Sequence, residues 1–262
     1  MLPPACGWTA PAAFPSLVSG EIGNAKMLTI DRRRFIGTLA AAAGAAQFGL
    51  VRPAVAAGGP VGFPEASSNP LRWPFVMGLL VANDAAAREA EIGALRDRTS
   101  YRRKLAYASS DRKKEVFAEA LIAWFTASKD VSFAALIVVD PDLKWPNDDK
   151  ERDTVMASLC QQLIQTAGAP QGLLLNIPER RKAPRDRTLR GLVPTPAEGA
   201  PPDMPNLDQT ARFLTGCLYG EATEASQALK VKLKEALKSA LKADALAGAH
   251  VAGKFTVAAV SL

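Results

Sequence analysis

Continuous apolar runs after residue 57 predict buried β-strands. Such runs have strand length and are bounded by proline, glycine or charged residues, which is typical of strands covered on both faces. The expected strands are 74–82, 133–139 and 172–177, with a short one at 104–108 and a last one at 255–262. The stretch 57–72 is rich in glycine, proline and serine and is expected to be extended or loose.

Segments with a helical apolar period lie between these runs. Asp84 and Asp111 precede two of them and are expected to be N-caps. The expected helices are 84–98, 112–127, 149–167, 206–219 and 226–246, and 178–205 is a long connection with one helical turn. Strands that alternate with helices predict a single α/β domain over 57–262.

The last of these helices has leucines at every fourth position, with lysines between them. The leucines are Leu229, Leu233, Leu237 and Leu241. A basic helix can lie on a membrane surface. This one also carries acids and has a single leucine stripe, which favours packing on the domain. No later segment is apolar enough to span a membrane, so we expect no transmembrane helix after residue 56.

The N-terminal segment 27–56 has the order of features of a twin-arginine signal peptide. Arg32, Arg33 and Phe35 fit the twin-arginine pattern, and a weakly apolar Ala-rich run follows. Ala54 and Ala56 supply small residues for cleavage after Ala56. The expected partners are therefore the twin-arginine translocase and a signal peptidase, and the expected location is periplasmic or secreted. The alternative is a basic turn before a buried Ala-rich helix.

The first 26 residues differ from this segment in having several prolines and no amphipathic period. Met27 places the arginines at the usual distance from a start codon. We therefore interpret 1–26 as a mis-annotated or disordered extension that is lost with the leader.

The net charge of +6 gives little support for a nucleic-acid partner. The segment 1–56 has five basic and two acidic residues, which leaves 27 basic and 24 acidic residues after it. An arginine-rich group at 180–190 could bind phosphates. Acids are interspersed within it and no aromatic residues are interleaved, so a solvated loop is the favoured interpretation.

Several kinds of catalytic chemistry are disfavoured by composition. His250 is the only histidine, which argues against Ser-His-Asp and Cys-His catalysis and against histidine-based zinc sites. The acidic turn at 140–149 resembles a calcium loop in composition only, because it lacks the central glycine and the bidentate glutamate. Cys160 and Cys217 lie in apolar helical contexts that favour buried thiols. The sequence does not decide whether they form a disulfide.

One motif in the predicted helix 206–219 carries a family resemblance. The residues Gln209, Ala211, Leu214, Thr215 and Gly216 follow the pattern Gln-x-Ala-x-x-Leu-Thr-Gly. This motif, with the order of the segments 74–81, 95–107 and 112–139, resembles the domain-of-unknown-function 3800 family. The resemblance implies a ribonuclease H-like fold, in which a mixed sheet is flanked by helices. In a nuclease of this fold, carboxylates hold two divalent metal ions, Mg or Mn, which activate water.

The acids that the resemblance implies are mostly replaced in this chain. At the four expected positions stand a shifted Glu65, then Lys104, Asn176 and Arg212. Two cations at such positions repel a divalent ion and could pair with Glu65 or hold an anion. We therefore expect no metal and no cofactor at this site.

Three interpretations follow. The favoured one is an exported, non-catalytic binding domain with an unidentified partner. The second is a metal-dependent nuclease or hydrolase with a non-standard carboxylate set, for which the candidates are Glu65, Asp140, Asp142 and Asp208. The third is an unrelated exported α/β protein whose motif match is accidental.

Overall fold

The computed structural model describes most of the chain that follows residue 58. The described residues are 59–66, 74–105, 112–138, 148–177, 181–193, 204–223 and 228–260. The expected leader and the candidate acids Asp140 and Asp142 lie outside them. No helix among the described residues is long and apolar enough to cross a membrane.

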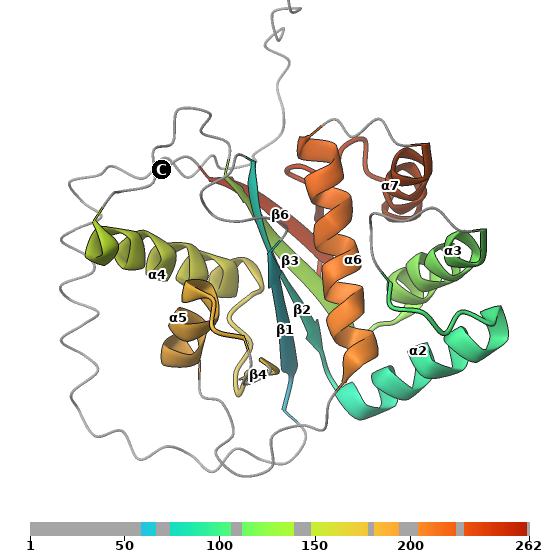
Figure 1. The fold of residues 1–262 in the computed structure, drawn as a ribbon, viewed down its shortest axis with the longest axis horizontal. Helices are drawn as coiled ribbons and strands as arrows, with labels where there is room; N and C mark the ends of the chain where they lie inside the picture. The colour runs from blue at the N-terminus through green and yellow to red at the C-terminus, as the bar shows by residue number, and fades with distance from the viewer. Residues whose placement is uncertain are drawn as a thin grey trace, which may run out of the picture.

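A mixed six-stranded sheet forms the centre of the described fold (Figure 1). Its strand order is β4-β1-β2-β3-β6-β5. The strands are β1 (Val61–Ala66), β2 (Phe75–Ala82), β3 (Val131–Val138), β4 (Leu174–Leu175), β5 (His250–Val251) and β6 (Phe255–Val260). Strand β2 pairs antiparallel with both β1 and β3, and β5 pairs antiparallel with β6, whereas β4 lies parallel to β1 and β6 lies parallel to β3.

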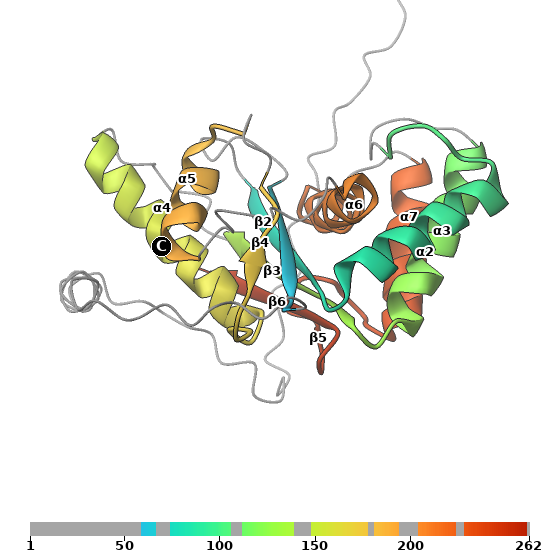
Figure 2. The ribbon, with the colours of Figure 1, turned by 90° about the horizontal axis from the view of Figure 1, so that it is seen from below.

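Helices cover both faces of this sheet. They are α2 (Ala85–Thr99), α3 (Arg112–Ala127), α4 (Asp149–Thr166), α5 (Pro184–Leu192), α6 (Pro205–Ala222) and α7 (Ala228–Leu241). Figure 2 shows α4 and α5 on one side of the strands and the other four helices on the opposite side. The prediction of an α/β fold with a mixed sheet flanked by helices is therefore confirmed at this level.

Two apolar clusters lie on the two faces, because successive strand residues point in opposite directions. Phe63, Val76 and Leu80 belong to the cluster under α2, α3, α6 and α7. Met77 and Leu79 belong to the cluster under α4 and α5. Both central strands, β2 and β3, are thus covered on both sides, which explains their continuous apolar runs.

The expected elements agree closely with the observed ones in the middle of the chain. The helix expected at 112–127 is α3, and the strands expected at 74–82 and 133–139 are β2 and β3. Asp84 is the N-cap of α2 and accepts a hydrogen bond from the backbone nitrogen of Ala87 at 3.4 Å. The leucine stripe of α7 packs into the core as expected, since Leu233 and Leu237 are buried.

Four local predictions differ from the structure. Residues 61–66 lie in the stretch that was expected to be extended or loose, and they form the paired strand β1, while β4 has two residues instead of the six expected. Lys104 and Leu105 are the described part of the strand expected at 104–108, and they are not in a strand. The backbone nitrogen of Leu105 instead donates to Oε1 of Gln209 on α6. The connection 178–205 contains the nine-residue helix α5 rather than a single turn, with Pro184 at its start and Leu189 buried.

Pro64 explains why the sequence did not predict β1 as a strand. The carbonyl of Gly62 accepts a bond from the backbone of Asn176 beyond β4, so residues 62 and 64 direct their backbone groups away from β2. The missing N–H of Pro64 therefore faces the outer side of the strand, where β4 no longer pairs with it. A proline is tolerated at such an edge position.

The close approach of α6 to the sheet depends on Gly78 of β2. A Cβ at this position would contact the hydroxyl of Thr215 on α6, and it would lie 2.7 Å from the ring of Phe133. Thr215 is fully buried and donates to the carbonyl of Ala211 at 2.8 Å. These motif residues therefore fix how α6 packs on β2.

The two cysteines of the described fold are not bridged. Both thiols are free and buried, and they lie in the apolar clusters on opposite faces of the sheet. This placement excludes the disulfide that the sequence left open.

Candidate functional site

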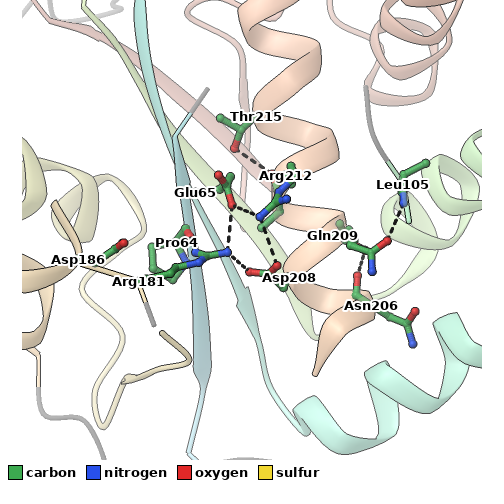
Figure 3. A network of polar contacts seen from close by, with 12 residues as sticks. Pro64, Glu65, Leu105, Arg181, Asp186, Asn206, Asp208, Gln209, Arg212 and Thr215 are labelled. Atoms are coloured by element: carbon green, nitrogen blue, oxygen red, sulfur yellow. Dashed lines mark hydrogen bonds and ion pairs between the residues drawn. The ribbon is translucent and has the colours of Figure 1, made fainter. Parts of the chain in front are cut away.

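Two acids and two arginines form a polar network between β1 and α6 (Figure 3). Nη2 of Arg181 lies 3.3 Å from Oε2 of Glu65 and 2.5 Å from Oδ1 of Asp208. Nη2 of Arg212 lies 3.3 Å from the same Oε2 and 3.6 Å from Oδ2 of Asp208. Each carboxylate is therefore in contact with both guanidinium groups. Arg181 also donates through Nη1 to the carbonyl of Pro64 at 3.0 Å.

The local structure explains why these side chains meet. Glu65 follows Phe63 by two residues in β1, so both point to the face that α6 covers. Asp208 and Arg212 are four residues apart on α6 and share one side of that helix. Arg181 comes after β4 and shortly before α5, and it reaches over the outer edge of β1.

The network is partly shielded from solvent and contains equal numbers of opposite charges. Side-chain exposure is 13% for Glu65, 16% for Arg181, 24% for Asp208 and 34% for Arg212. Nε of Arg212 is buried without a hydrogen-bond partner. Since both acids are already matched by cations, the arrangement resists a divalent cation rather than attracting it. No group of three or more His, Cys, Asp or Glu residues among the described ones could hold a metal ion.

A second polar network lies on the other side of α6 and is organised by Arg96 of α2. Its guanidinium donates to Oδ1 of Asn206 at 2.5 Å, to Oε1 of Gln209 at 2.9 Å and to the carbonyls of Tyr101 and Arg103 at 3.3 and 2.8 Å. It also lies over the ring of Phe117, 4.7 Å from the ring centre. Burial lowers the pKa of Arg96, an effect that the nearby Tyr101 opposes. We call these residues the Arg96 hub.

Gln209 has a structural role in this hub. Its Oε1 accepts from the backbone nitrogen of Leu105 at 2.7 Å and thereby fixes the segment 101–105 against α6. The backbone nitrogens of Asn206 and Leu207 both donate to the carboxylate of Glu89 on α2 at 2.9 Å. Glu89 therefore caps the N-terminus of α6, where unpaired N–H groups and the helix dipole favour an anion.

The structure brings some of the expected site residues together and separates others. Glu65, Asp208 and Arg212 meet, as expected for a pairing of Arg212 with Glu65. Lys104 does not join them, because it is exposed on the 101–105 segment beyond α6. Asn176 lies just beyond β4, and its backbone nitrogen donates to Gly62. The motif residues Ala211 and Leu214 are buried in the core, and Gly216 is half-buried.

Arg181 was missed by the sequence reasoning, which assigned the group 180–190 to a solvated loop. Arg185 of this group is also largely buried and donates from Nε to Oδ1 of Asp186 at 2.9 Å. Asp186 is 1% exposed and lies in the first turn of α5, where a negative charge is favoured. The alternation of arginine with acids was the available signal, since buried arginines need such partners.

The two thiols do not provide a reactive nucleophile. Burial raises the pKa of Cys160 to about 12, although Arg185 opposes this shift. Burial also raises the pKa of Cys217, against a smaller opposing effect of Lys114. Both groups remain protonated at neutral pH, and a protonated thiol is a poor nucleophile.

The fold and this network together define an α/β protein with a mixed sheet and a charge-balanced polar site at the junction of β1 and α6. Comparisons with family models, with curated protein sequences and with solved structures find no match to this chain. The resemblance of the Gln209–Gly216 motif to a family therefore stays a prediction from the residues that carry it.

Proposed function

We propose that the segment after residue 56 is a degenerate ribonuclease H-like domain that binds a partner and does not cleave nucleic acid. The observation that carries this proposal is the pairing of Glu65 and Asp208 with Arg181 and Arg212. A mixed sheet with α6 packed beside Glu65 is the arrangement that this proposal requires.

The chemistry of the site supports loss of metal binding. A two-metal nuclease needs several carboxylates with uncompensated negative charge around the ions. Here two guanidinium groups lie in contact with the two available acids, and a dication would have to displace them against their repulsion. The same ion pairs join β1 to α6. The two guanidinium groups therefore neutralise the acids, which is the role that bound metal ions have in a two-metal nuclease.

The test is cleavage of labelled RNA and DNA by the purified protein, with Mn²⁺ or Mg²⁺ and a chelator control, together with calorimetric titration of Mn²⁺. We expect neither cleavage nor Mn²⁺ binding. The double variant Arg181→Ala/Arg212→Asp removes both cations and adds an acid, and it should gain measurable Mn²⁺ binding. Metal-dependent cleavage by the unaltered protein that survives repurification would overturn the proposal.

A second candidate function is a hydrolase with a non-standard carboxylate set. The convergence of Glu65 and Asp208 on one guanidinium favours it, because two of its proposed acids do lie close together. If cleavage is found, Asp208→Ala and Asp140→Ala should each abolish it. Full activity in both variants would exclude this set.

Export by the twin-arginine route is the proposed path to the working location. In a bacterial host that expresses the full chain, we expect a processed protein in the periplasm whose N-terminus is Ala57. Arg32→Lys/Arg33→Lys should leave the unprocessed chain in the cytoplasm, as judged by fractionation and N-terminal sequencing. Unchanged processing in that variant would mean that the twin arginines are not the export signal.

A further inference from the structure

Three oxygen acceptors at the junction of β1 and α6 surround one guanidinium group. Nη1 of Arg181 donates to the carbonyl of Pro64 at 3.0 Å, and Nη2 lies 3.3 Å from Oε2 of Glu65 and 2.5 Å from Oδ1 of Asp208. We call these three acceptors the guanidinium cradle. A guanidinium is a planar fork of several donors and can meet such a set, whereas the charge of an ammonium group is concentrated at one nitrogen.

The cradle is positioned by contacts that do not involve Arg181. Strand β1 pairs with β2 along its full length, and α6 is capped by Glu89 and packs closely on Gly78. Arg212 reaches both carboxylates from α6, whereas Arg181 reaches them from beside β1 (Figure 3). We therefore expect the three acceptors to stay in place when Arg181 leaves.

The segment that carries Arg181 is likewise anchored without the cradle. Helix α5 follows Arg181 and packs on α4, with Leu189 buried in the apolar cluster of that face. It also contains the buried ion pair between Arg185 and Asp186. Residues 181–183 lie outside any helix or strand, so the Arg181 side chain can swing away without breaking the ladder of a helix or sheet.

The charge that remains after such a movement matches a single cation. Without Arg181, the network contains two acids and Arg212, a net charge of −1. One monovalent cation restores the balance, and the three acceptors favour a guanidinium over an ammonium group. Asp208 and Arg212 are the most exposed members of the network, so the cradle can be reached from solvent.

We propose that the guanidinium cradle binds an arginine side chain of the partner protein, and that Arg181 occupies it until the partner displaces it. This inference rests on the proposed function as a binding domain and names the group that the partner presents. Arg181 is tethered beside the cradle and competes at a high effective concentration. A free arginine therefore binds the unaltered chain weakly, and the partner must add contacts elsewhere.

The first test is titration of the purified protein with Nα-acetyl-arginine amide, followed by NMR. Arg181→Ala should bind this probe at least about tenfold more tightly than the unaltered chain does, because the competing side chain is gone. Nα-acetyl-lysine amide should bind the same variant at least about fivefold more weakly. Arg187→Ala removes an exposed arginine of α5 and should bind the probe as the unaltered chain does. Thermal melting of each variant verifies that it is folded.

A second measurement uses the unaltered chain and does not depend on the folding of Arg181→Ala. The Nε–H signal of Arg181 is identified by its absence in Arg181→Lys, which keeps the charge. This signal should move towards that of a solvent-exposed arginine as the arginine amide is added, and it should stay unchanged with the lysine amide.

Three results would overturn the proposal. They are equal affinity of Arg181→Ala and Arg187→Ala for the arginine amide, equal affinity of Arg181→Ala for the two amides, and an Arg181 signal that does not move during the titration. Cleavage and Mn²⁺ binding are measured separately. Arginine-selective binding together with metal-dependent cleavage would reject only the proposed loss of cleavage, whereas the absence of both would reject only the role of the cradle.

Discussion

The two sides of α6 carry polar networks that are stabilised in different ways. On one side, Glu65, Arg181, Asp208 and Arg212 balance full charges against each other in a partly exposed site. On the other, Arg96 is satisfied by carbonyl and amide oxygens alone and lies over an aromatic ring. The first network depends on charge balance and the second on hydrogen-bond geometry. The difference shows that one helix can be anchored by two kinds of contact, which should differ in their sensitivity to salt concentration.

The largest expected effect is removal of the Arg96 guanidinium. Arg96→Ala deletes four hydrogen bonds and the contact with Phe117, and we expect the free energy of unfolding to fall by about 3 kcal/mol. Chemical denaturation measures this change. Arg98→Ala, on the same helix and exposed, should change stability by no more than about 0.5 kcal/mol. Equal losses in the two variants would show that the hub does not anchor α6.

A smaller effect is expected from neutralising the two acids of the other network. Glu65→Gln/Asp208→Asn leaves Arg181 and Arg212 close together without counter-charges, which should lower the free energy of unfolding by about 1–2 kcal/mol at low salt. Salt screens the repulsion between the two guanidiniums, so the loss should shrink in 1 M NaCl.

Salt dependence is what separates the two networks. The loss in Arg96→Ala should be the same at both salt concentrations, because its acceptors are neutral. If the stability loss in Glu65→Gln/Asp208→Asn is the same at both salt concentrations, then charge balance is not what distinguishes the network between β1 and α6 from the Arg96 hub.

The last expected effect is confined to alkaline pH and concerns a second cation held by neutral oxygens. Lys254 donates to the carbonyls of Ser128 and Val131 and lies 4.4 Å from the ring centre of Phe125. It therefore resembles Arg96, but its ammonium group can lose a proton. Burial lowers the pKa of Lys254 to about 8 from its ordinary value of 10.5, against an opposing effect of Asp130.

The sign of the resulting pH dependence follows from linkage. Between about pH 8 and 10.5 the unfolded chain binds more protons at this lysine than the folded chain does. The free energy of unfolding of the unaltered protein should therefore rise relative to Lys254→Met over this range, and the difference should be flat below pH 8. Denaturation curves at several pH values measure it, and a falling or constant difference would contradict the assignment.

The elements of the fold were predictable where the apolar period was regular. Helix α3 and strands β2 and β3 are of this kind, because burial on one or both faces fixes their residue pattern. Strand β1 was not predictable in this way, since Gly62 and Pro64 are typical of loops. A strand tolerates them only where its outer side lies at the edge of the sheet. That information lies in the topology and not in the local sequence.

The candidate site was predictable only in its α6 and β1 components. Glu65, Asp208 and Arg212 stood out because of their positions relative to a motif. Arg181 comes from a segment whose composition is typical of a solvated loop, and only the three-dimensional arrangement places it against two acids. The roles of Glu89 and Arg96 were likewise hidden, because each acts across more than 100 residues of sequence.

Pro64 and its contact with Arg181 have a consequence for the solubility of the protein. Among the described residues, no strand pairs with the outer edge of β1 beyond the two residues opposite β4, and an edge of this kind is a place where a strand from another molecule could add. Pro64 offers no N–H there, and its carbonyl is already bonded to Arg181. A foreign strand would therefore find neither a donor nor a free acceptor at this residue, and the guanidinium would block its approach. The arginine that balances the acids thus also protects the sheet against edge-to-edge aggregation.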